Sequence, residues 1–143
     1  MKEIHRIIIP VDKSDASKAA TEQGAQIAKA LGVDVVVLSI DDSNTFIASP
    51  AIEEKIKKEN EASIAEFKHI AEAREVPVHT EIIKGTNPAE EIIKFSQETD
   101  LIVMASHNKK GIDRLILGSV SEEVLRCALC PVLIIKPEFF EEK

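Results

Sequence analysis

The chain has 143 residues, with 25 acidic against 18 basic side chains and a net charge of −7, and this is the length of one ordinary domain. An acidic chain of this kind argues against a broad nucleic-acid or anionic-membrane surface, because either surface needs a basic face. Five Phe with no Trp or Tyr also argue against an aromatic stacking platform for single-stranded nucleic acid. We therefore expect a single domain over residues 1–143 that binds neither nucleic acid nor membrane.

No segment approaches the roughly 18 consecutive apolar residues of a membrane span. The first residues, MKEIHRIIIPVDKS, lack the apolar core of a signal peptide. Two cysteines are too few for a disulfide scaffold. Together these observations predict a soluble, cytoplasmic protein.

The first half of the chain alternates strand and helix patterns. Residues 5–11 are a short apolar run that predicts a buried strand, and Ser14 or Asp15 can cap the helix that follows. Small residues recur at helical spacing in that helix, which ends at Gly32. Residues 33–40 predict a second strand, apolar enough to be central in a parallel sheet. In the charged helix expected over about 51–74, Glu and Lys favour a solvated face over a binding site.

The second half continues the alternation. Residues 76–83 alternate in the manner of an edge strand, and Asn87, Pro88 and Glu90 have the cap, proline and acid typical of a helix start. Residues 100–105 predict a fourth strand, and a helix over about 120–128 leads to a fifth strand at 131–136. This order predicts a doubly wound, Rossmann-like α/β fold, with helices on both faces of one five-stranded parallel sheet.

The last strand predicts a partner. In both common doubly wound orders it lies at an edge of the sheet. Its residues Val132, Leu133, Ile134 and Ile135 are apolar on both faces, and a bare apolar edge is an aggregation hazard. We expect a second copy of the chain to cover it in a homodimer, and coverage by the C-terminal tail is the alternative.

Several common sites are missing from the sequence. There is no P-loop, no G-x-G-x-x-G fingerprint and no metal-ligand spacing among the four histidines. Cys127 and Cys130 form a C-x-x-C at the C-terminal end of a predicted helix, where the dipole disfavours a thiolate. We interpret both as small apolar fillers. Asp41 and Asp42, after the second strand, could meet a ribose hydroxyl or simply cap a loop.

The stretch SHNKKGIDRLILGSV after the fourth strand is far longer than the roughly two to six residues usual between a strand and a helix. Three of its residues are basic and one is acidic. Ligands of doubly wound sheets bind where the strand order reverses, which for the order 3-2-1-4-5 lies between strands one and four. Strand one ends at Asp12 and strand four at Met104 and Ala105, so we expect Asp12 and this loop to face one crevice.

The helix after the loop begins with a recognisable cap. Ser119 and Glu122 match an S-x-x-E capping box, which would leave the amides of Ser119, Val120 and Ser121 at the positive end of the helix dipole. This arrangement favours an anion such as a phosphate chain. The alternative is an ordinary capped helix behind a solvated loop.

Three segments, IIIPVDKSDAS, GTNPAEEIIKFSQETDLIVMASHN and LILGSVSEEVLRCALCPVLIIKP, resemble the universal stress protein family, and the resemblance covers nearly the whole chain. It implies the strand order 3-2-1-4-5, a cytoplasmic location and a dimer paired through the last strand. The ATP-binding branch of this family carries G-x-x-G-x9-G-[ST]. At the matching positions this chain has Ala105 and Asn108 in place of the first two glycines, and it keeps Gly118 and Ser119.

The resemblance also implies a nucleotide site for ATP or a related adenine nucleotide, with or without Mg²⁺. In that site Asp12 and the backbone of Val11 and Ile40 would hold the adenine. Met104 and Ala105 would lie by the ribose, and Asn108 and residues 118–121 would hold the phosphates. The full set of implied site residues is Pro10, Val11, Asp12, Ile40, Met104, Ala105, Ser106, His107, Asn108, Gly118, Ser119, Val120 and Ser121.

Three functions stay open at this point. The first is a dimeric module of the stress response that binds ATP and acts on an unknown protein partner. The second is a dimeric adaptor with the same fold that binds no nucleotide. The third is a slow ATPase with Asp12 near a metal, Ser119 or Ser121 as phosphoryl acceptor and His107 as acid or base. Since no constellation of nucleophile, base and orienting group is visible, we expect no enzyme.

Overall fold

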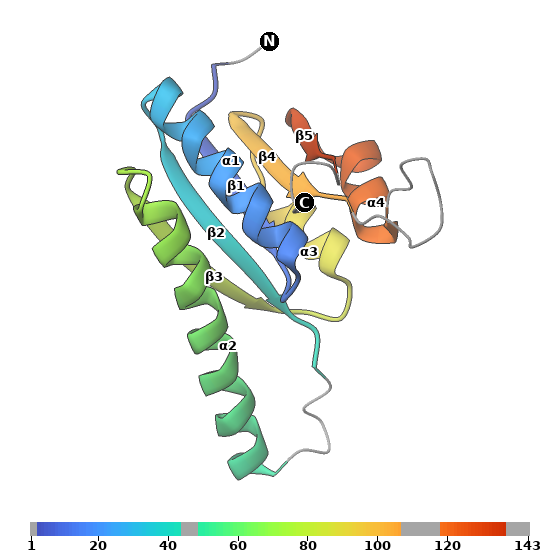
Figure 1. Ribbon diagram of the computed structural model, residues 1–143. Coiled ribbons are helices and arrows are strands. Elements are labelled where there is room, and N and C mark those ends of the chain that lie inside the picture. The colour runs from blue at the N-terminus through green and yellow to red at the C-terminus, as the bar shows by residue number, and fades with distance from the viewer. Residues whose placement is uncertain (1–2, 44–48, 107–117, 137–143) are drawn as a thin grey trace, which may run out of the picture.

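The computed structural model describes residues 3–43, 49–106 and 118–136, and within these ranges strands and helices alternate along the chain (Figure 1). All the strands lie parallel in one sheet of order β3-β2-β1-β4-β5. This confirms the predicted doubly wound fold and the edge positions of the third and last strands. The elements are β1 (Arg6–Val11), α1 (Asp15–Leu31), β2 (Asp34–Asp41), α2 (Pro50–Glu72), β3 (Val78–Lys84), α3 (Pro88–Phe95), β4 (Asp100–Ala105), α4 (Ser119–Cys127) and β5 (Val132–Ile135).

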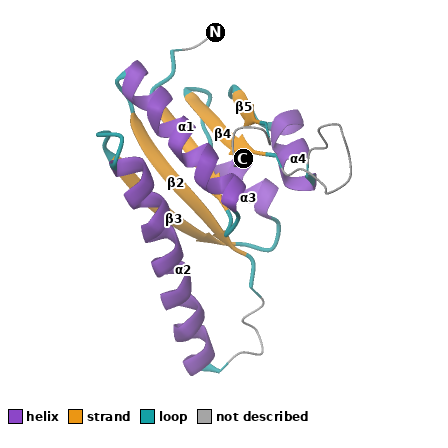
Figure 2. Cartoon of the chain, viewed as in Figure 1, coloured by secondary structure: helices purple, strands orange, loops and turns teal. Residues whose placement is uncertain are grey.

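Helices cover both faces of the sheet (Figure 2). Successive side chains of a strand point to opposite faces, and β1 shows the result. Ile7 and Ile9 belong to the core cluster under α1 and α2, whereas Ile8 belongs to the cluster under α3 and α4. All three are fully buried, so β1 is the centre of the fold and its C-terminal end opens between the two helix layers.

α1 lies close against β1 because its inward stripe is made of small residues. A Cβ added at Gly24 would lie 2.5 Å from Cδ1 of the buried Ile9, so glycine is what allows this approach. The helix begins at the N-cap Ser14, whose side chain accepts a hydrogen bond from the Ser17 amide, and ends at Gly32 in the left-handed region with φ 70°. Both ends agree with the sequence-based expectation.

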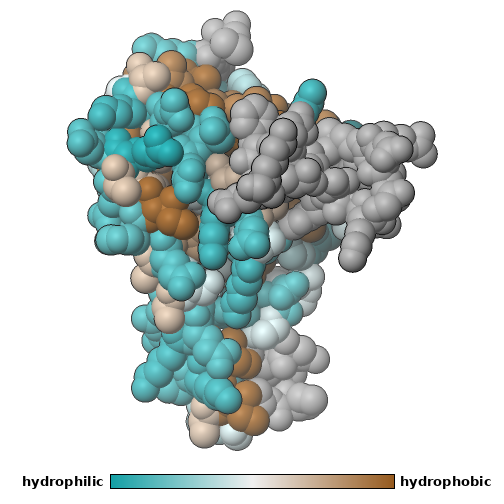
Figure 3. Space-filling view, viewed as in Figure 1, coloured by the Kyte–Doolittle hydropathy of each residue, from teal (hydrophilic) through white to brown (hydrophobic). Residues whose placement is uncertain are grey.

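α2 reaches well beyond the sheet (Figure 1). Its C-terminal half is anchored by the buried residues Ile64, Phe67 and Ala71. Its N-terminal half is covered mainly by hydrophilic side chains, with a small apolar patch near the helix start (Figure 3), where Ile52 is 51% exposed. No helix in the described ranges has the length and apolar character needed to cross a membrane.

β1 separates from β4 toward its C-terminal end. Their pairing runs from Arg6 opposite Asp100 to Ile8 opposite Ile102, whereas β1 stays paired with β2 as far as Val11. Pro10 has no N–H to give to a ladder. The separation opens the sheet at the reversal of strand order, where the sequence predicted a crevice.

Candidate ligand-binding site

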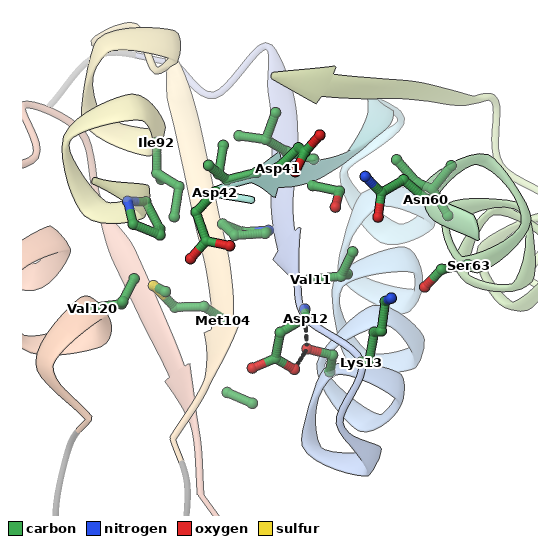
Figure 4. A pocket seen from close by; sticks show the side chains of 18 of the residues that line it. Val11, Asp12, Lys13, Asp41, Asp42, Asn60, Ser63, Ile92, Met104 and Val120 are labelled. Atoms are coloured by element: carbon green, nitrogen blue, oxygen red, sulfur yellow. Dashed lines mark hydrogen bonds between the residues drawn. The ribbon is translucent and has the colours of Figure 1, made fainter. Parts of the chain in front are cut away.

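A cavity of about 640 Å³ lies at the C-terminal ends of β1, β2 and β4 (Figure 4). This volume is within the range usual for small-molecule sites, about 300–1,000 Å³. The cavity brings together most of the predicted site residues, and α1 and α2 complete its wall. The lining residues are Pro10, Val11, Asp12, Lys13, Ser17, Leu38, Ser39, Ile40, Asp41, Asp42, Ser43, Ile56, Glu59, Asn60, Ser63, Ile64, Pro88, Ile92, Met104, Ala105, Gly118, Ser119, Val120 and Ser121.

Asp12 is held in place by the turn that follows β1. Its Oδ1 accepts hydrogen bonds from the Ser14 amide at 2.9 Å, from the Ser17 hydroxyl at 2.8 Å and from the Ser14 hydroxyl. Its own amide donates to Ser17 Oγ at 2.9 Å. The carboxylate therefore has a fixed position at the mouth of the cavity (Figure 4), and it is exposed.

The N-terminus of α4 forms the opposite wall. The first helical hydrogen bond runs from the Glu122 amide to the Gly118 carbonyl at 2.9 Å. The amides of Ser119, Val120 and Ser121 precede that bond, and a helix provides no carbonyl for them. Three such amides at the positive end of a helix dipole make a suitable place for an anion.

The predicted cap of α4 was wrong by one residue. The N-cap is Gly118, without a side-chain hydrogen bond, and Ser119 is the first helical residue, so Ser119 and Glu122 form no capping box. Gly118 has φ −68°, a value that any residue adopts. A Cβ there would meet nothing within 4 Å among the described residues. As far as those residues show, the fold does not require a glycine at this position, and the absent side chain leaves the cavity wall open there.

The end of β4 divides its residues between the cavity and the core. Met104 and Ala105 line the cavity, and Ala105 also packs against the core cluster beneath α1. Ser121 Oγ donates to the Ala105 carbonyl at 3.2 Å. Ser106, also implied as a site residue, is buried, lies outside the lining and donates its hydroxyl to the Ile135 carbonyl at 3.3 Å. The structure therefore places Ser106 beside the end of β5 and not at the cavity.

His107 and Asn108, the remaining implied site residues, lie outside the described residues, as do the basic residues of the loop. Among the residues that are described, no group of three or more His, Cys, Asp and Glu side chains is arranged to hold a metal ion. Of the two serines named as possible phosphoryl acceptors, Ser121 donates its hydroxyl to the Ala105 carbonyl, and Ser119 lines the cavity.

The wall that sequence reasoning missed comes from α2. Asn60 and Ser63 line the cavity with Ile56 and Ile64, although the charged face of this helix was interpreted as merely solvated. Figure 4 shows Asn60 and Ser63 directed from α2 toward the ends of β1 and β2. A signal was present in the sequence, because these two polar residues interrupt the inward apolar stripe that includes Ile56, Ile64 and Phe67.

Comparison with known proteins gives a consistent result. Residues 3–136 match the sequence model of the universal stress protein family. The chain is 38% identical to a universal stress protein of Methanocaldococcus jannaschii over 92% of its length and 81% of the relative. It is 30% identical to one of Mycolicibacterium smegmatis, over 92% of this chain but only 45% of that protein. A universal stress protein of Archaeoglobus fulgidus, solved in complex with dAMP, has the same fold, with a TM-score of 0.69, 21% identity and coverage of 95% and 100%.

Proposed function

The chain belongs to the universal stress protein family, and from that premise we propose that it is a cytoplasmic regulatory module that binds an adenine nucleotide, ATP first among them. The proposal rests on one observation, which is that two features suited to a nucleotide line the same cavity. One is the opening between β1 and β4, and the other is the N-terminus of α4.

The cavity offers a place for each part of such a ligand. The amides of residues 119–121 suit phosphate oxygens, and Mg²⁺ would arrive with the phosphates. The apolar side chains of Val11, Ile40 and Met104 suit the flat base and the ribose. The Archaeoglobus protein holds dAMP in the same fold, but at 21% identity it supports the fold alone. The proposal therefore rests on the cavity of this chain.

Ala105 is compatible with this proposal although it replaces a glycine of the family's ATP-binding branch. Its methyl group packs against the core beneath α1, so the methyl group takes only part of its contacts from the space of the ligand. We therefore expect Ala105 to weaken binding rather than abolish it.

A thermal-shift titration with ATP, ADP and AMP, with and without Mg²⁺, tests the proposal. We expect a saturable rise in Tm, because a ligand that binds only the folded state stabilises it. Gly118→Val fills space at the amides and should remove this rise while the ligand-free Tm stays close to the wild-type value. Arg126→Ala, at the exposed end of the same helix, is the matched control and should leave the rise intact. A flat response up to millimolar ATP would overturn the proposal and favour the adaptor function.

We also propose that a second copy of the chain covers β5. The strand is at the edge of the sheet, so one side of its backbone has no partner strand among the described elements. Three leucines are exposed here: Leu133 on the strand by 38%, and Leu125 and Leu129, which precede it in the chain, by 47% and 79%. An unpaired strand edge next to exposed leucines is the kind of surface that proteins bury in an interface.

Light scattering coupled to size-exclusion chromatography tests the dimer. The wild-type chain, of 15.7 kDa, should elute at twice that mass. Leu133→Lys places a charge in the proposed interface and should shift the protein toward the monomer. Ile52→Lys, at the exposed end of α2, is the control and should leave the dimer unchanged. A wild-type monomer at micromolar concentration would contradict this proposal without affecting the nucleotide site.

A further inference from the structure

The cavity has a second side that lies beyond most of the implied nucleotide contacts. Side chains alternate along β2, so Leu38 and Ile40 belong to the cluster beneath α3 and α4. Ser39 and Asp41 therefore point to the opposite face, toward α2. The cavity thus passes around the strand ends, from the α4 side to a lobe bounded by β2 and α2 (Figure 4).

Asn60 is the polar group best placed in this lobe. It is partly buried on the inward stripe of α2, and Figure 4 shows its amide reaching into the cavity toward the end of β2. Among the described residues, the side chains of Asn60 and Ser63 have no hydrogen-bond partner. Their polar atoms are open to the cavity, since every fully buried side-chain nitrogen and oxygen in the described residues has a hydrogen-bond partner, so they can pair with a group that enters it. A ligand would provide the missing partner.

The surroundings of Asn60 indicate the chemistry of that partner. Val11, Ile56 and Ile64 give the lobe apolar walls that suit a flat ring. Of the described charged residues, Asp41 and Glu59 line it together with Lys13, and two acids beside one base oppose a phosphate. The group that enters this lobe is therefore a neutral, flat one, and the anionic end of the ligand is left for α4.

An asparagine amide presents a donor and an acceptor side by side. Among the parts of an adenine nucleotide, the base presents the complementary pair in fixed positions, because its N6 amine lies beside a ring nitrogen, N7 on one edge and N1 on the other. Ribose hydroxyls rotate, and phosphates only accept. We infer that Asn60 binds the N6/N7 edge of the adenine base and makes the site selective for adenine, an inference that rests on the proposed nucleotide function.

The test compares ATP with 7-deaza-ATP, in which N7 is replaced by a C–H group and the N6 amine is kept. Loss of one neutral hydrogen bond corresponds to about fivefold in affinity. Isothermal titration of the wild-type chain should therefore show 7-deaza-ATP binding about fivefold more weakly than ATP. In Asn60→Leu the two ligands should bind equally, and the ligand-free protein should have a raised Tm because the apolar stripe of α2 is restored.

Lys58→Ala, on the exposed side of the same helix, is the matched control and should keep the wild-type preference. If Asn60→Leu does not fold, Asn60→Ala gives the same comparison with a smaller side chain. Equal binding of both ligands to the wild-type chain would overturn the inference, and so would an unchanged preference in the Asn60 variants. Either result leaves the proposed function standing, whereas failure of the wild-type chain to bind ATP at all overturns both.

Discussion

The two ends of the sheet are built in opposite ways. At the N-terminal end β1 and β4 are paired, and Arg6 binds Asp100 through Nε–Oδ1 at 2.8 Å and a second nitrogen to Oδ2 at 3.1 Å. The Gln97 amide donates to the same Oδ2 at 2.7 Å. At the C-terminal end the two strands separate, and the side chains of Asn60 and Ser63 face a cavity without hydrogen-bond partners in the described part of the chain.

This difference indicates that the N-terminal end of the sheet stabilises the fold, whereas the C-terminal end leaves space for a ligand. Asp100 is only 1% exposed, and both of its carboxylate oxygens accept hydrogen bonds from within the chain. Arg6 also lies over the Phe95 ring, 4.8 Å from its centre. The N-terminal end is therefore closed by satisfied interactions, whereas the C-terminal end leaves amides and side chains for an outside partner.

The largest effect is expected at the closed end, from Asp100→Ala. Removing one partner of a buried ion pair leaves the other charge uncompensated, which lowers the free energy of unfolding by about 3–5 kcal/mol. Because the Arg6 side chain is 29% exposed, we expect a value near the lower limit. Denaturant unfolding measures it, and the double variant Arg6→Met with Asp100→Leu should recover part of the loss. A loss below about 1 kcal/mol would show that this end is not closed in the way described.

A single substitution made at two glycines sharpens the comparison. Gly24→Val forces α1 away from Ile9 in the middle of the sheet, and overpacking of this kind lowers stability by about 1–3 kcal/mol. Gly118→Val, at the open end, should change stability by about 1 kcal/mol or less, but it should remove nucleotide binding. Gly24→Val should therefore show the larger loss in denaturant unfolding, and Gly118→Val the larger loss in nucleotide titration. A large stability loss in Gly118→Val would contradict this contrast.

The smallest expected effect is a difference in reactivity between the thiols of Cys127 and Cys130. Burial raises the pKa of the Cys130 thiol, and the charge of Asp100 raises this pKa further. Cys127 is exposed. At pH 8 we expect a thiol reagent to modify Cys127 promptly and Cys130 only after denaturant is added, since the thiolate is the reactive form. Equal rates for the two thiols would place Cys130 outside the closed end.

Much of the fold was predictable because its elements carry local signals. The caps at Ser14 and Asn87, the stop at Gly32 and the apolar runs of the strands each act within a few residues, and the structure confirms them. Element ends differed by one or two residues, as for α2, expected over about 51–74 and found at Pro50–Glu72. The order of strands followed from the resemblance together with the rules for doubly wound sheets.

The parts that were missed depend on contacts between distant residues. Arg6 and Asp100 are 94 residues apart, and nothing in either local sequence marks the pair. The helical spacing of Asn60 places it on the inward stripe of α2, but that it reaches a cavity depends on how α2 crosses the end of β2. The N-cap of α4 was misassigned because a capping-box pattern is short and common, whereas the chain uses Gly118.

An NMR titration of the ¹⁵N-labelled chain with AMP tests the central claim most directly, because it reports on both ends of the sheet in one experiment. We predict saturable amide shifts at Asp12 and at Ser119, Val120 and Ser121, together with a shift of the Asn60 side-chain amide. The amides of Gln97 and Asp100 should stay in place. Shifts centred on Gln97 and Asp100, or no shifts anywhere at millimolar AMP, would contradict the assignment of the ligand to the open end.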